Sequence, residues 1–103
     1  MAESHYQLVM RDAGEEILLV AARRAIDTRS IVAVFDAGRG PGPHAEHTLT
    51  ISVRDTGLSV SSYGIPHEWL PVHTGSIDTR FSRLVGGLLG DLVAKAQKAG
   101  LFL

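Results

Sequence analysis

The stretch from Ser76 to Gly100 predicts one long amphipathic helix, and it limits the possible folds of this chain more than any other feature. Ser76 can accept a hydrogen bond from a free amide of the first turn, and Asp78 puts a negative charge at the positive end of the helix dipole. Gly100 suits the left-handed position that ends a helix, with Leu101 folding back onto the last turn. Apolar side chains recur between these ends at helical spacing: Ile77, Phe81, Leu84, Val85, Leu88, Leu92 and Ala96. This pattern predicts a helix that packs one face on a core.

Three glycines, Gly86, Gly87 and Gly90, interrupt this helix. Each disfavours helical structure by roughly 1 kcal/mol relative to alanine, and such a cost is tolerated where another part of the fold approaches closely. Two interpretations are open: the helix packs on a sheet of the same subunit, or it meets a helix of a second subunit. The second interpretation makes Gly86 and Gly90 candidate interface residues.

The segments His47–Val53 and Leu58–Ile65 predict a β-hairpin. Apolar residues alternate with serine and threonine along the first segment, as expected for a strand with one buried face. A four-residue loop that ends at Gly57, with positive φ at this glycine, pairs Val53 with Leu58. The same register places residue 51 opposite 60, residue 47 opposite 64 and residue 44 near 67, and it joins apolar positions on one face.

The N-terminal part of the chain predicts a short strand followed by a helix. Tyr6, Leu8 and Met10 occupy alternate positions, which is typical of a half-buried strand. Asp12 stands three residues before Glu15, as in a capping box, and predicts a helix over residues 13–26. A short similarity between residues 9–14 and the hairpin turn at 52–57 leaves an alternative in which residues 17–20 form a strand. The alanine- and arginine-rich end of the segment favours the helix.

The element order is then strand, helix, strand, strand, strand, helix, because Ile31–Phe35 is a continuous apolar run of strand length. This order predicts a single α+β domain over residues 1–103. We expect a two-layer sandwich, with a mainly antiparallel sheet of about four strands and both helices on one face. Residues 1–4 are expected to be disordered, residues 37–46 to form a glycine–proline loop, and residues 66–75 to connect the hairpin to the last helix.

The composition excludes several classes of protein. The chain has 103 residues, no cysteine and a net charge of −1, so disulfides and thiolate metal sites are excluded and the absence of a basic block argues against nucleic-acid binding. No apolar run approaches the ~20 residues that span a bilayer. No secretion signal is visible at the N-terminus, so we expect a cytoplasmic location without membrane attachment. The predominance of arginine over lysine suggests a bacterial source.

Histidines form the one constellation that could carry chemistry. The hairpin register gathers His44, His47 and His67 at the open end of the hairpin, where three imidazoles could bind zinc, copper or nickel. This interpretation makes a divalent metal the cofactor of a metal-binding protein or a metal-dependent hydrolase. The alternative is that these are solvated loop side chains and that the chain has no cofactor.

The leading functional hypothesis is a non-enzymatic binding or protein-interaction module. No serine–histidine–acid set can be assembled from the spacing, and the glycine-rich loop before residue 44 is not followed by a helix that could bind phosphate. Trp69 lies in an apolar, proline-marked segment and is read either as a plug over the core or as an interface anchor. Together with Gly86 and Gly90 it suggests self-association as a homodimer, or binding to a protein partner.

Overall fold

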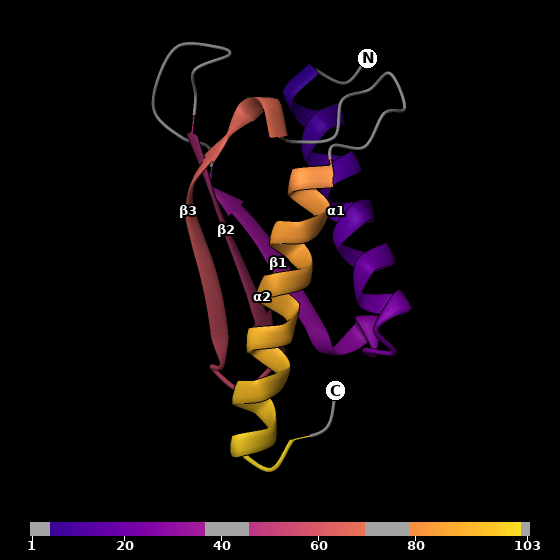
Figure 1. The fold of residues 1–103 in the computed structure, drawn as a ribbon, viewed down its shortest axis with the longest axis vertical. Coiled ribbons are helices and arrows are strands. Elements are labelled where there is room, and N and C mark those ends of the chain that lie inside the picture. Colours follow the sequence, from indigo (N-terminus) through magenta and orange to yellow (C-terminus); the bar gives the residue numbers. More distant parts are fainter. Residues whose placement is uncertain (1–4, 37–45, 70–78, 102–103) are drawn as a thin grey trace.

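The structure is a computed structural model, and it describes residues 5–36, 46–69 and 79–101. Its elements follow the order α1 (His5–Arg23), η1 (Thr28–Ser30), β1 (Ile31–Asp36), β2 (Glu46–Val53), β3 (Ser59–Pro66), η3 (His67–Trp69) and α2 (Thr79–Lys98). The strands form an antiparallel sheet in the order β1-β2-β3, and both long helices lie on the same side of it (Figure 1). The α+β class is confirmed, but the described part of the chain has three strands where the sequence predicted about four.

The missing strand is the one predicted around Tyr6, Leu8 and Met10. α1 begins at His5 and continues without a break to Arg23, so the helix predicted from residue 13 starts earlier, and the strand prediction and the hairpin alternative are both wrong. Alternation over so few residues is a weak signal, whereas extending an existing helix adds one hydrogen bond for each residue that is fixed. The buried side chains of α1 follow helical spacing: Ala13, Glu16, Ile17, Val20 and Ala21.

The hairpin has the predicted register near its turn. The amide of Val53 donates to the carbonyl of Leu58 at 2.9 Å, and Ile51 pairs with Val60. Gly57 has φ of 76°, as the loop requires. These pairings confirm the predicted alignment near the turn, which joins apolar positions on one face of the sheet.

The register changes at the other end of the hairpin. Leu49 pairs with Ser62, but His47 pairs with Ile65, so β3 carries one extra residue and the predicted pairing of residue 47 with 64 is wrong. The bulge contains Gly64 at φ of 67°, a left-handed conformation that glycine adopts without steric cost. Strict alternation would turn Ile65 away from the helices, and the bulge returns its side chain to the core, where it is buried.

The core lies between the helices and the sheet. Its largest fully buried side chains come from α1, the sheet and α2: Phe81, Ile17, Leu49, Ile51, Ile65, Leu89, Leu92 and Val85. Phe35, near the end of β1, stacks on Phe81 with ring centroids 6.1 Å apart. The apolar stripe predicted for α2 is buried or partly buried wherever it is described, and Leu89 adds to it.

The C-terminal end of α2 is the predicted cap. Gly100 has φ of 78°, the amide of Leu101 donates to the carbonyl of Ala96 at 2.8 Å, and the amide of Gly100 donates to that of Gln97 at 3.0 Å. These two bonds are the Schellman pattern. The predicted N-cap, Ser76, lies outside the described residues. Within the described ranges, no helix is both long and apolar enough to cross a bilayer.

Candidate functional site

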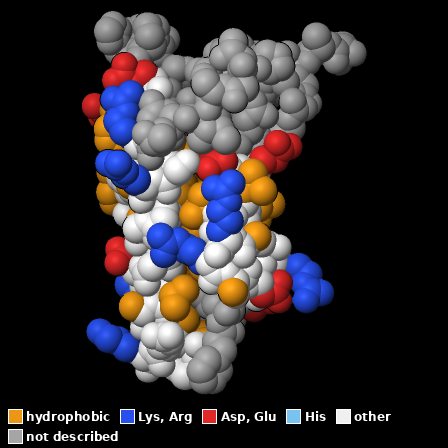
Figure 2. Space-filling view, turned by 45° about the vertical axis from the view of Figure 1, so that its right-hand side comes forward, with side chains coloured by type: hydrophobic (Ala, Val, Ile, Leu, Met, Phe, Trp, Pro, Cys, Tyr) orange, Lys and Arg blue, Asp and Glu red, His pale blue; other side chains and the backbone are white. Residues whose placement is uncertain are grey.

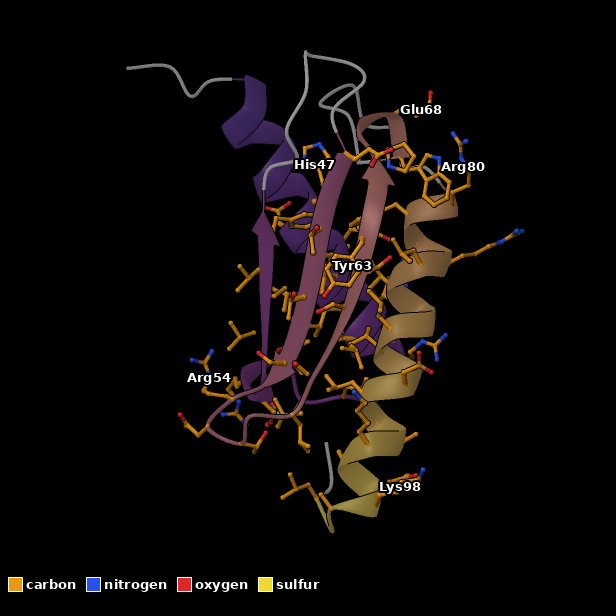
Figure 3. All side chains as sticks on the ribbon, turned by 90° about the vertical axis from the view of Figure 1, so that its left-hand side faces the viewer. His47, Arg54, Tyr63, Glu68, Arg80 and Lys98 are labelled. Atoms are coloured by element: carbon orange, nitrogen blue, oxygen red, sulfur yellow. The ribbon has the colours of Figure 1, made fainter. Side chains whose placement is uncertain are left out.

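The side of the sheet that faces away from the helices is uncovered by any described element (Figure 3). Apart from Glu46 at the start of β2, the described side chains that strand alternation places on it are uncharged: Val32, Val34, Thr48, Thr50, Ser52, Ser59, Ser61 and Tyr63. Val34 is 49% exposed and Tyr63 is 78% exposed. The Thr50 and Ser61 hydroxyls join across the strands at 2.9 Å, so part of the polar surface is satisfied within the sheet. We call this set the outer sheet face.

The outer sheet face ends at β1, which is an edge strand because, among the described strands, it pairs only with β2. The amide of Arg54 donates to the carbonyl of Ser30 at 2.8 Å, and these residues are directly opposite in the continued β1–β2 register. Hydrogen-bonded and non-hydrogen-bonded pairs alternate in antiparallel sheets, so the backbone groups of Ile31, Ala33 and Phe35 point away from β2. Among the described residues, these edge groups have no strand partner.

The opposite edge of the sheet is protected. β3 is the other edge strand, and α2 packs along it. The Nζ of Lys95 on α2 donates to the carbonyl of Ser59 at 2.9 Å, which occupies an outward backbone group of β3 with a cation. Charged side chains over an edge are a common way to prevent pairing with another chain. β1 has no comparable protection within the described ranges, since residues 31–35 are all uncharged and Ala33 and Val34 are exposed.

The predicted histidine site can be placed only in part. His44 lies outside the described residues. His47 lies on β2 with its side chain 2% exposed, so it is not the solvated loop residue of the alternative interpretation. The backbone of His67 begins η3, directly after β3 at the same end of the hairpin as His47. Among the described residues, no group of three or more potential ligands is close enough to hold a metal ion. Metal binding that includes His44 stays a prediction.

Trp69 belongs to η3 and is partly buried against the core cluster. The guanidinium carbon of Arg80, in the first turn of α2, lies 5.3 Å from the centroid of the indole ring. Figure 3 shows Arg80 and Glu68 at the same end of the molecule as His47. The tryptophan thus joins the end of the hairpin to the start of α2 by packing and by a cation–π contact. Its role as an interface anchor stays a prediction.

The glycines of α2 differ in their surroundings. Gly86 is buried, and a Cβ at this position would lie 2.8 Å from Nη2 of Arg24 and 3.5 Å from its Cζ. The close neighbour is therefore a side chain that follows α1 in the same chain. Gly87 and Gly90 are exposed, and a Cβ added at either would have no described atom within 4 Å. An interface role for Gly90 stays a prediction.

A groove between α1 and α2 was not singled out by the sequence. It has a volume of about 410 Å³ and is lined by Val20, Arg23, Arg24, Ser82, Arg83 and Gly86. Figure 2 shows Lys and Arg side chains near the middle of the helical side of the molecule. The arginines of the groove come from segments far apart in sequence, so spacing alone could not bring them together. The buried glycine was the one signal that another side chain lies over α2.

The comparisons with known proteins give this chain no relative. Neither the protein-family models, nor the curated proteins, nor the solved structures contain a match to it. The functional interpretation therefore depends on the geometry of the outer sheet face, the β1 edge and the helix groove.

Proposed function

We propose that this protein is a non-enzymatic interaction module that self-associates by pairing β1 with β1 of a second copy. The observation that supports this most is the contrast between the two sheet edges. α2 and Lys95 protect β3, whereas β1 presents uncharged residues 31–35 and outward backbone groups. An exposed, apolar edge of this kind is a template for pairing with another strand. Joining two such edges would convert two three-stranded sheets into one continuous sheet.

The sequence of β1 suits antiparallel pairing with itself. A two-fold axis at Ala33 would pair its outward backbone groups with those of the partner subunit's Ala33. Ile31 would then lie opposite Phe35 of the partner subunit, and Val32 opposite Val34 of the partner subunit. Pairs of aliphatic and aromatic residues across strands are favourable.

The same register avoids electrostatic repulsion. Asp36 would lie opposite Ser30 of the partner subunit, so no like charges would face each other across the new pair of strands. A second copy fits this edge because, about an axis at Ala33, each apolar residue of β1 meets another apolar residue of the same strand in the partner subunit. The outer sheet face would also double in width across the axis, and its serine, threonine and valine side chains would be available to a further partner.

The experiment uses a variant that blocks the edge and spares the fold. Ala33→Pro removes one outward amide, while the hydrogen bonds of β1 to β2 come from neighbouring residues. Proline is tolerated in edge strands when its missing N–H faces away from the sheet. Sedimentation equilibrium should show a concentration-dependent dimer for the natural chain and a monomer for Ala33→Pro, with the same far-UV circular dichroism.

A second pair of variants keeps the test decisive if proline disturbs the strand. Val34→Lys places a charge on the outer sheet face next to the proposed axis and should weaken the dimer. Ser61→Lys places the same charge on the same face of β3, at the far edge, and should leave the dimer unchanged. The proposal is wrong if the natural chain sediments as a monomer at all concentrations, or if the two lysine variants weaken the dimer equally.

A further inference from the structure

The groove between α1 and α2 concentrates positive charge in a chain whose net charge is −1. Arg23 is the last residue of α1, Arg24 follows it, and Arg83 lies one turn into α2. All three side chains are exposed. No hydrogen bond or ion pair joins their guanidinium groups to another residue in the described ranges. Arg29, by contrast, binds Asp27, and Arg54 donates to a backbone carbonyl.

The position of Arg83 is not explained by helix stability. Cations are favourable near the C-terminus of a helix, and this accounts for Arg23 and Arg24 at the end of α1. Arg83 stands a full turn into α2, beyond either helix end, so the dipole gives its charge no such benefit. Three like charges around one groove also repel one another. An anion in the groove would relieve this repulsion.

Gly86 shapes the groove. A Cβ here would lie 2.8 Å from Nη2 of Arg24, so the missing side chain allows this guanidinium to lie directly against α2. Glycine in a helix interior costs roughly 1 kcal/mol relative to alanine. Because residue 86 has no side chain, the guanidinium of Arg24 can reach the surface of α2 that also carries Arg83.

Ser82, which lines the groove, has a partner on α1. Ser82 donates its hydroxyl proton to Oε1 of Glu16 at 2.9 Å, and the Glu16 side chain is buried. With Ser82 occupied as a donor, the arginines are the groups of the groove that can donate to a ligand. The described residues that line the groove include three arginines and no carboxylate.

We infer that this groove binds the phosphate or diphosphate group of a small molecule. Guanidinium groups present planar pairs of N–H donors that match phosphate oxygens, and phosphates carry the charge that three arginines require. The volume, about 410 Å³, is within the range of small-molecule sites. Within the described ranges, three arginines meet at this one groove, whereas a nucleic-acid site needs cations spread along a face. The inference is independent of the proposed self-association.

The test is a titration of the whole chain with inorganic pyrophosphate, monitored through the arginine Nε–Hε signals in NMR spectra. The signals of Arg24 and Arg83 should shift and saturate, and sodium chloride at the same ionic strength should not reproduce the shifts. Arg24→Gln and Arg83→Gln should each weaken binding by about tenfold or more, since each removes charge-assisted hydrogen bonds. Arg54→Gln, a change of the same kind in the hairpin loop, should leave the affinity unchanged.

Three results would overturn the inference. The first is the absence of saturable shifts at millimolar pyrophosphate. The second is equal weakening by Arg54→Gln and Arg83→Gln, which would indicate non-specific attraction of anions. The third is a single-stranded oligonucleotide that binds far more tightly than pyrophosphate with an affinity that grows with its length, which would assign the arginines to nucleic acid. Circular dichroism of each variant separates loss of binding from loss of fold.

Discussion

The two glycines proposed from the sequence as interface residues provide a matched pair of substitutions in one helix. Gly90→Ala adds a methyl group at an exposed position with no described atom within 4 Å, so the methyl meets no obstacle among the described residues. The gain in helix propensity is roughly 1 kcal/mol. For a domain of this size, that gain corresponds to a rise in Tm of about 4–8 °C.

Gly86→Ala brings the same gain in propensity together with a conflict. Its Cβ would lie 2.8 Å from Nη2 of Arg24, so the guanidinium must move. Because that group ends a flexible side chain, the movement offsets part of the gain without a core cavity or backbone strain. We therefore expect a smaller rise in Tm than for Gly90→Ala, with a shifted Arg24 Nε signal and weaker pyrophosphate binding.

The assay is thermal unfolding followed by circular dichroism at several protein concentrations. Gly90→Ala should raise Tm by a similar amount at each concentration, since the proposed β1 pairing leaves the added methyl clear of a second copy. A fall in Tm for Gly90→Ala, coupled to a loss of the concentration dependence, would refute this reasoning. Such a result would show that a second subunit packs on this part of α2, because partner binding makes Tm depend on concentration.

Three further predictions concern the polar contacts and the bulge. Ser82→Ala removes the donor to buried Glu16 and should lower the free energy of unfolding by about 1–3 kcal/mol, measured by urea denaturation. The backbone amide of Arg29 holds the pKa of Asp27 below its ordinary value of 3.8, so the stability that this exposed carboxylate adds should be present above pH 3.8 and lost as pH falls through the lower folded value. Asp27→Asn should remove that acid dependence, so the difference in Tm between the natural chain and Asp27→Asn should shrink as pH falls through this range. A difference in Tm that stays constant with pH would contradict this reasoning. Gly64→Ala forces a left-handed conformation on alanine and should cost about 1–2 kcal/mol; equal stability would show that the bulge can relax.

The sequence determined those features that depend on neighbours along the chain. The stripe of α2 and its Gly100 cap follow from residues within a few turns of one another, because helical periodicity and the Schellman bonds are local. The turn of the hairpin is equally local, and its four-residue loop with Gly57 fixes the pairing of Val53 with Leu58. The α+β class follows from the order of these elements.

The tertiary structure decided those features that depend on how the helices and strands pack against one another. The first residues had a weak alternation that could not show whether a strand had a place in the sheet, and in the fold they extend α1. The bulge at Gly64 arises because Ile65 is buried more favourably when it faces the helices, and this choice depends on where the helices lie.

The candidate sites divide in the same way. His47 lies on the same face of β2 as Leu49, a direction that alternation along the strand indicates, but the extent of its burial is set by the tertiary structure. Arg23, Arg24 and Arg83 are gathered only when α1 and α2 pack side by side. The sequence predicted β1, the hairpin and α2 because their signals are short-range, but it placed a strand where α1 begins. It could not predict the edge left unprotected or the groove, because both arise from the relative positions of elements far apart in the chain.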